Sequence, residues 1–266
     1  MQLPPDITKP LIDEAALLIK QTYLQYINFE SGEGFEVPPT YDPFATISGV
    51  SVGPKFSRTE PFGFIARNKN SNVLWAAFRG PRSLEDWIAN FVVRGARHPW
   101  GIVEDTFYRL YVQSGRLIRW MPALSPLPTA LVLTGHSLGA ALAILAASEL
   151  AVLAGQIPLH VITFGGPRVG DPHFATEYNR LVPSTLRIVN TEDLIPAVPL
   201  ASAHFSSGKR IFLNTTLLGR MAQVAGSDDF DYQHVGAVLT FTRHVGSISA
   251  NHSIDLYSSF TDTLSL

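Results

Sequence analysis

A serine lies between two glycines at the end of an apolar run, in Gly135-His136-Ser137-Leu138-Gly139. The apolar residues 131–133 before it predict a strand, and the Ala-, Leu- and Ile-rich residues 140–153 after it predict a helix. A sharp strand-turn-helix forces the serine into strained backbone geometry, and side chains in place of the two glycines would collide. The motif therefore presents the Ser137 hydroxyl as a nucleophile, with the helix N-terminus and the Leu138 N–H directed at any oxyanion formed there.

The sequence contains a second Gly-x-Ser-x-Gly pentapeptide, Gly49-Val50-Ser51-Val52-Gly53, so the pattern alone does not identify the nucleophile. Pro54 follows it directly, and proline disfavours helical geometry in the residue before it. No helical apolar period follows either. We therefore expect Ser51 to be a strand or loop serine and Ser137 to be the nucleophile.

A serine hydroxyl is a poor nucleophile until a histidine accepts its proton and an acid orients that histidine. When such a serine follows a strand of an open α/β sheet, the chain order should be serine, acid, histidine. This order reduces the eight histidines to four candidates, which are His204, His234, His244 and His252.

The acid should lie just past the carboxyl end of a strand, where open α/β sheets build their sites. Asp193 fits, because residues 187–189 predict a strand that runs into a loop ending at Pro196. Glu192 in the same loop is the reserve. Asp171, in Gly170-Asp171-Pro172, is better explained as a turn residue.

Among the histidines, His252 is favoured because it lies between a polar loop and the final predicted helix. His234, in Tyr232-Gln233-His234-Val235-Gly236, is the main alternative, although it could equally be a structural histidine that bonds backbone groups. The residues alone leave His204 and His244 open as well.

The elements that must position these groups alternate between strands and helices, which predicts an α/β fold with a mostly parallel central sheet and helices on both faces. No linker-like change in composition divides residues 1–266, so we expect one domain, with residues 1–30 forming an N-terminal helix packed on it. The expected helices are Leu11–Phe29, Thr106–Trp120, Leu138–Ala154 and Phe174–Asn179. The expected strands are Phe62–Arg67 and Val73–Phe78 as a hairpin, Ala130–Thr134, Leu159–Phe164, Leu186–Val189, Arg210–Asn214 and Val238–Thr242, with a turn-rich stretch from Ser31 to Pro43.

The composition excludes several classes of function. With 46% hydrophobic and 16% charged residues, the chain can bury a large core, and its net charge of −2 gives no reason to expect nucleic acid as a partner. No apolar run is long enough for a membrane span. Zero cysteines exclude disulfides and a thiol nucleophile. Residues 1–6 lack the features of a signal peptide, so we expect a cytoplasmic protein or a secreted one without its leader.

Five ordered blocks of the sequence resemble the class 3 lipase family, the fungal-type triacylglycerol lipases and their relatives. The blocks are Trp75-Ala76-Ala77-Phe78-Arg79-Gly80, Thr134–Ala140 around Ser137, Thr163–Gly170, Asn190–Pro199 around Asp193, and His252–Tyr257. The resemblance covers roughly residues 60 to 260 and leaves mainly the N-terminal helix outside.

This resemblance implies an α/β-hydrolase fold and a Ser137, Asp193, His252 triad, with His234 outside it. It also implies a carboxylic ester hydrolase, a triacylglycerol lipase first of all, that needs no cofactor and no metal. The partner would be a lipid or ester substrate at a lipid–water interface. An esterase for short or aromatic acyl groups on the same machinery is the alternative.

The sequence departs from the family at Pro81, which stands where these lipases usually carry a second oxyanion donor, a serine or threonine. Proline has neither a backbone N–H nor a hydroxyl. We expect Leu138 N–H to be one donor and Arg82, or else Ser83, to replace the other. A slow enzyme or an inactive lipid-binding hydrolase is the further alternative that Pro81 raises.

A short amphipathic helix is predicted next to this position. Ser83-Leu84-Glu85-Asp86 resembles a capping box, and the apolar residues Leu84, Trp87, Ile88, Phe91 and Val92 recur at helical spacing. In the resembled lipases this segment is the lid over the site, so we expect Trp87, Ile88 and Phe91 to form a lid and substrate surface. A greasy acyl pocket is expected near Trp87 and Leu200–Phe205.

An acidic segment at residues 228–234 contains enough carboxylates to suggest a cation. Hard-metal sites need six or more oxygens in a defined loop, and no such spacing is present. We expect a solvated acidic loop with no bound metal.

Overall fold

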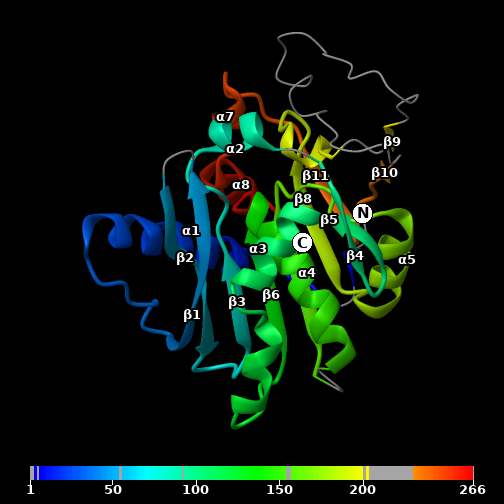
Figure 1. Cartoon of the computed structure of the whole chain (residues 1–266). Helices are drawn as coiled ribbons and strands as arrows, with labels where there is room; N and C mark the ends of the chain where they lie inside the picture. Colours follow the sequence, from blue (N-terminus) through cyan, green and yellow to red (C-terminus); the bar gives the residue numbers. More distant parts are fainter. Residues whose placement is uncertain are drawn as a thin grey trace.

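Seven strands form the central sheet of the computed structural model, which describes residues 3–4, 6–53, 56–91, 93–153, 157–199, 202–203 and 230–265 (Figure 1). In spatial order the strands are β1 (Tyr41–Gly53), β2 (Phe56–Asn68), β3 (Leu74–Phe78), β6 (Leu131–His136), β7 (Leu159–Phe164), β8 (Thr185–Asn190) and β11 (Ala237–Phe241). The five strands from β3 to β11 are parallel, and β1 and β2 add an antiparallel edge. The predicted mostly parallel sheet is therefore confirmed.

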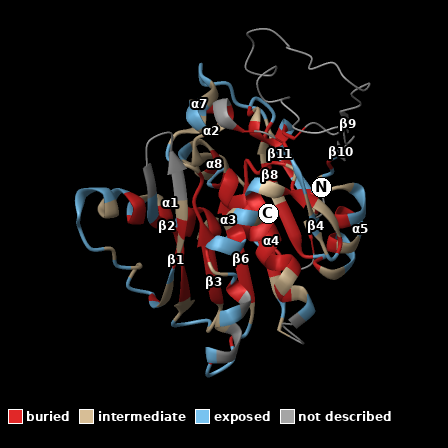
Figure 2. Ribbon diagram, viewed as in Figure 1, coloured by how far each residue is buried: buried red, intermediate tan, exposed pale blue. Residues whose placement is uncertain are grey.

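Helices cover both faces of this sheet. On one face lie α1 (Lys9–Ser31) and α8 (Ile254–Thr261), which pack against each other. The other face carries α4 (Leu138–Leu153), flanked by α3 (Asp105–Gln113) and α5 (Pro172–Leu181). The central strands and α4 are almost entirely buried (Figure 2). Continuous apolar runs such as Leu131–Leu133 suit strands that are covered on both sides.

The remaining elements are short. They are α2 (Leu84–Asn90), α7 (Ile248–Asn251), the 3₁₀ helices η1 (Leu117–Ala123) and η2 (Ile195–Ala197), and the two-stranded pairs β4 (Gly95–His98) with β5 (Gly101–Glu104) and β9 (Ser202–Ala203) with β10 (Phe230–Asp231). Helices α2 and α7 lie next to each other at one end of the molecule (Figure 1).

The structure differs from the expected elements at two places. The helix predicted over Thr106–Trp120 ends at Gln113, because Gly115 and Arg116 adopt left-handed backbone angles, with φ of 97° and 48°, that interrupt a helix. A shorter 3₁₀ helix, η1, follows. The long strand β1, which contains Ser51, was also missed as an element, since its residues carry proline and glycine and pair only with β2 at the sheet edge. The strand expected at Arg210–Asn214 lies outside the described residues.

Strand register brings the carboxyl ends of four parallel strands to one edge. Phe78 pairs with Gly135, His136 with Phe164, and Phe164 with Ile188. The loops that follow β3, β6, β7 and β8 therefore start close together. These loops carry Gly80, Ser137, Gly165 and Asp193.

Candidate active site

Ser137 stands on a strained turn between β6 and α4. Its φ of 58° lies in the left-handed region, which is energetically unfavourable for any residue that has a side chain. The glycines two residues away make the turn possible. A Cβ on Gly135 would lie 2.1 Å from the Gly139 carbonyl oxygen, and one on Gly139 would lie 2.3 Å from the Phe78 carbonyl oxygen. The turn is held further by the Ser137 N–H, which donates to the Phe164 carbonyl at 3.0 Å.

Asp193 and His252 come together although 59 residues separate them. His252 Nδ1 lies 2.6 Å from Asp193 Oδ2, and both side chains are buried. The second carboxylate oxygen, Oδ1, accepts a hydrogen bond from the Ile195 N–H at 2.9 Å. A carboxylate at this distance accepts a hydrogen bond from Nδ1–H, so the proton stays on Nδ1 and the lone pair is on Nε2.

Ser137 Oγ and His252 Nε2 are two of the seven buried side-chain N and O atoms in the described residues that have no hydrogen-bond partner. Both residues lie next to the end of β7, at Phe164 and Gly165. The Ser137 N–H bonds the Phe164 carbonyl, and a Cβ on Gly165 would lie 3.1 Å from His252 Cε1. Such unpaired groups are costly in a protein interior and often mark functional positions. An unpartnered hydroxyl and an unpartnered imidazole nitrogen are the two groups that a serine nucleophile and its base require.

Tyr257, on α8, extends the acid's hydrogen bonds. Its hydroxyl donates to Asp193 Oδ2 at 2.6 Å and accepts from the Asn190 N–H at 3.1 Å. Burial, followed by the nearby Asp193 carboxylate, raises the pKa of Tyr257 well above its usual value, so the hydroxyl keeps its proton. No role for this tyrosine was predicted from the sequence, although it lies only five residues beyond His252.

The loops that carry the acid and the base are joined by two asparagines. The Asn190 side chain donates to the Asn251 carbonyl at 3.0 Å and to the Arg243 carbonyl at 2.9 Å. The Asn251 side chain in turn donates to the Glu192 carbonyl at 3.2 Å. This network fixes the β8 loop against α7 and so sets the relative position of Asp193 and His252.

The loop after β3 passes directly beside Ser137. A Cβ on Gly80 would lie 2.8 Å from the Ser137 Cβ. The Gly80 N–H already donates to the Tyr23 hydroxyl at 3.0 Å, and Pro81 has no N–H. The next backbone donor along this loop belongs to Arg82, whose side chain is exposed and paired with Glu30 at 3.5 Å.

Helix α2 follows this loop and lies across both the acid and the base loops. Ser83 caps it by accepting from the Asp86 N–H at 3.1 Å, as the sequence predicted. Ile88 is 1% exposed and packs with Ile195 and Val198 of the acid loop, in a cluster that Ile248 of α7 also joins. Trp87 and Phe91 face Phe107 of α3, with ring centroids 6.2 and 5.5 Å from it.

The other candidates have structural roles. Asp171 caps α5 by accepting from the Phe174 N–H at 2.7 Å. His234 Nε2 bonds the Pro196 carbonyl at 2.8 Å, and burial lowers the pKa of His234 to about 3. Glu192 and His244 form an exposed pair at 3.3 Å. His204, residues 228–229 and most of Leu200–Phe205 lie outside the described residues, and so does the expected acyl pocket there.

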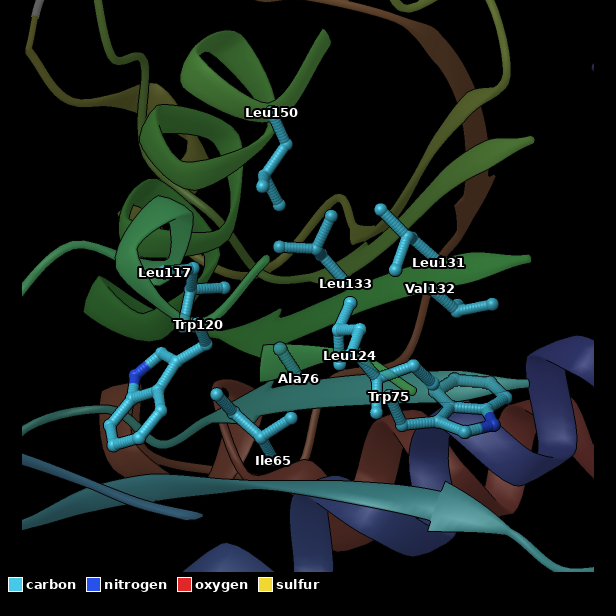
Figure 3. Close-up of a pocket in the computed structure, with 11 residues that line it drawn as sticks. Ile65, Trp75, Ala76, Leu117, Trp120, Leu124, Leu131, Val132, Leu133 and Leu150 are labelled. Atoms are coloured by element: carbon cyan, nitrogen blue, oxygen red, sulfur yellow. The ribbon is translucent and has the colours of Figure 1, made fainter. Parts of the chain in front are cut away.

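A separate apolar cavity lies at the amino-terminal ends of β3 and β6, beneath η1 (Figure 3). Its volume is about 30 Å³, which holds no more than one or two water-sized groups. Leu117, Trp120 and Leu150 are among its lining residues. Because the candidate site lies at the opposite ends of these strands, the cavity is not its acyl pocket.

In the part of the chain that the structure describes, no group of three or more His, Cys, Asp or Glu side chains is placed to hold a metal ion. Within the same residues, no helix combines the length and apolar character of a membrane span.

The sheet order and the strand-turn-helix unit at Ser137 define an α/β-hydrolase fold, and similar solved structures agree. A lipase from Rhizopus microsporus var. chinensis superposes with a TM-score of 0.56 at 22% identity, covering 74% of this chain and 71% of the lipase. Lipase II from Rhizopus niveus superposes with a TM-score of 0.57, also at 22% identity, covering 73% of this chain and 77% of that lipase.

The sequence comparisons point to the class 3 lipases. The family model for class 3 lipases matches residues 75–203. Phospholipase A1 EG1 of Oryza sativa subsp. indica is 29% identical over 86% of this chain, and phospholipase A1-Igamma2 of Arabidopsis thaliana is 33% identical over 47% of it. The chain spans 58% of the first relative and 23% of the second. Residues 75–203 of this chain therefore resemble the class 3 lipase family.

Proposed function

We propose that this protein hydrolyses the carboxylic esters of acyl lipids through a Ser137, His252, Asp193 triad. One observation carries the proposal. A histidine bonded to a buried carboxylate at 2.6 Å has a free Nε2, and a buried serine with a free hydroxyl stands on the strained turn beside it. The match of residues 75–203 to the class 3 lipase model supports the same chemistry.

In the proposed mechanism, Ser137 Oγ attacks the ester carbonyl carbon while His252 Nε2 takes the hydroxyl proton. Asp193 keeps the imidazole in the tautomer with the proton on Nδ1 and stabilises the imidazolium that forms. His252 then gives its proton to the leaving alcohol, which leaves an acyl-serine. Water, deprotonated by His252, releases the acid and restores Ser137.

Oxyanion stabilisation is assigned to the Leu138 N–H at the start of α4 and to the Arg82 N–H in the loop after β3. Proximity supports Arg82, because Gly80 touches Ser137, its own N–H is occupied and Pro81 has none. Losing one such donor costs roughly 100- to 1000-fold in turnover. Turnover comparable to that of ordinary lipases would therefore imply that a donor replaces the one missing at Pro81.

Triacylglycerol is the first substrate we propose, with helix α2 acting as a lid. The packing of Ile88 on the acid loop supports the lid, since it places an apolar helix over the site. Phospholipase A1 activity is a second candidate, because the sequence relatives carry that name. We also propose that residues 1–266 work as one domain, since α1 buries its apolar side on the same sheet that carries the site.

The decisive experiment compares the purified protein with its Ser137→Ala variant on four substrates. These are p-nitrophenyl butyrate, p-nitrophenyl palmitate, emulsified triolein and phosphatidylcholine vesicles. Turnover that disappears in the variant supports the serine mechanism, and the preferred substrate separates lipase, esterase and phospholipase.

A serine-directed phosphonate tests the remaining alternative. Covalent labelling of the wild-type protein, but not of Ser137→Ala, is expected of the proposed enzyme. A folded protein that neither turns over these esters nor reacts with the phosphonate would be an inactive lipid-binding hydrolase, and the proposal would be wrong.

A further inference from the structure

The hydroxyl of Tyr23, on the N-terminal helix α1, reaches the edge of the candidate site. It lies 2.6 Å from His136 Nδ1 and accepts the Gly80 N–H at 3.0 Å. His136 directly precedes the proposed nucleophile, Ser137. Gly80 lies next to Ser137, since a Cβ on Gly80 would be 2.8 Å from the Ser137 Cβ. Tyr23 lies outside residues 75–203, the stretch that the class 3 lipase model matches.

The direction of each hydrogen bond follows from the groups involved. His136 Nε2 lies 2.7 Å from the His252 carbonyl oxygen, which can only accept, so Nε2 carries the proton. Burial, together with the adjacent His252, lowers the pKa of His136 well below its usual value, and the ring is neutral. Its Nδ1 is therefore an acceptor, and the Tyr23 hydroxyl donates to it.

Tyr23 keeps its own proton. Burial raises the pKa of Tyr23 to about 12, so it remains a neutral phenol through the working range of a hydrolase. The result is a series of three hydrogen bonds with one direction. Gly80 N–H donates to Tyr23, Tyr23 donates to His136, and His136 donates to the backbone of His252. The rings of His136 and His252 also lie close, with centroids 4.5 Å apart.

The other side of Gly80 is held as firmly. Arg79 Nη1 donates to the Gly80 carbonyl at 2.8 Å, and the Arg79 side chain, 0% exposed, is paired with Glu60 at 2.7 Å. Tyr23 and Arg79 thus fix the peptide groups before and after Gly80. The direction of the chain into Pro81 and Arg82, where the second oxyanion donor is proposed, depends on both.

We propose that Tyr23 is a positioning residue whose hydroxyl sets the oxyanion loop at Gly80 and, through His136, the backbone of His252. The inference rests on the proposed ester hydrolysis. Its geometric consequence is that helix α1 completes the site, since no other described residue bonds both Gly80 N–H and His136 Nδ1.

The test is Tyr23→Phe, which keeps the ring and removes only the hydroxyl. The matched control is Tyr41→Phe, because the buried Tyr41 hydroxyl bonds Glu14 of the same helix but lies on β1, away from the site. Both variants weaken the attachment of α1 to the rest of the protein, but only Tyr23→Phe removes the hydrogen bond to His136. For each variant, kcat and KM are measured on p-nitrophenyl butyrate, alongside the rate of phosphonate labelling and the thermal midpoint.

We expect Tyr23→Phe to lower kcat and the labelling rate by roughly 10- to 100-fold with little change in KM, as expected when a reacting group is displaced by a fraction of an ångström to about 1 Å. Tyr41→Phe should lower the thermal midpoint by a similar amount and leave kcat within about twofold. Nitrogen-15 spectra of the histidine rings report whether the hydrogen bond to His136 has been lost, and the fall of kcat at constant KM separates positioning from a purely structural role. The His136 Nδ1 resonance should shift in Tyr23→Phe and stay in place in Tyr41→Phe.

A Tyr23→Phe variant with wild-type kcat and labelling rate would overturn the inference while leaving the proposed function intact. Equal losses of kcat in both variants would also overturn it, because they would trace to the attachment of α1. If the wild-type protein shows neither turnover nor labelling, the proposed function is wrong, and the positioning role of Tyr23 that rests on it is wrong as well.

Discussion

Truncating Ile88 should release the proposed lid. Ile88 is 1% exposed and contacts Ile195 and Val198 on the loop that carries Asp193, so its side chain stabilises the arrangement in which α2 covers the site. An Ile88→Ala change removes three carbon groups, or about 2.4 kcal/mol at roughly 0.8 kcal/mol each. If that contact is lost on opening, the equilibrium between covered and open site moves by roughly 50-fold, since about 1.4 kcal/mol corresponds to a factor of ten.

The assay follows p-nitrophenyl butyrate hydrolysis from dilute solution through the concentration at which the ester separates from water. The wild-type protein should be slow on dissolved ester and accelerate at the interface, because the lid opens there. Ile88→Ala should raise the rate on dissolved ester, by up to roughly 50-fold if opening limits turnover, and flatten the increase at the interface.

Ile47→Ala is the control, since Ile47 is 3% exposed but lies on the edge strand β1. It should lose about 2–4 kcal/mol of unfolding free energy without any gain in rate. The reasoning about Ile88 fails if Ile88→Ala loses as much unfolding free energy as Ile47→Ala and leaves the rate on dissolved ester unchanged. Ile88 would then belong to the core, and α2 would not be a lid.

Three further outcomes follow from the site. Asp193→Asn should keep the fold but lower kcat by roughly 10⁴-fold, because the amide favours the wrong His252 tautomer, and stopped-flow or steady-state assays would detect any milder loss that contradicts this. Tyr257→Phe should lower the unfolding free energy by about 1–3 kcal/mol in urea titrations, since it leaves the Asn190 N–H unpaired; an unchanged value would mean that water replaces the hydroxyl. Burial raises the pKa of Glu104 to about 7, so folded protein holds this proton between pH 4.5 and 7 while unfolded protein loses it, and stability falls as the pH rises through that window. Glu104→Gln should remove that fall, and identical pH profiles for the two proteins would refute the assignment.

Local sequence determined the nucleophile turn and most of the elements. The glycines two residues before and after Ser137 are required because other backbone atoms approach them closely. Apolar periodicity predicted the positions of α1, α4, β6, β7 and β8 to within a few residues. The cap of α2 at Ser83 was likewise predictable, because a capping side chain bonds the backbone of its own helix within three residues.

Tertiary structure decided what depends on residues far apart in the chain. Asp193 and His252 could be proposed from chain order, but their bond joins loops 59 residues apart, and only the β8 and α7 packing brings them together. Tyr23 bonds His136 across 113 residues, and nothing in the local pattern of an amphipathic helix marks which of its tyrosines reaches the site. Periodicity reports which face of an element is buried, whereas the partner of each buried polar group is set by the order of strands in the sheet and the helices packed on it.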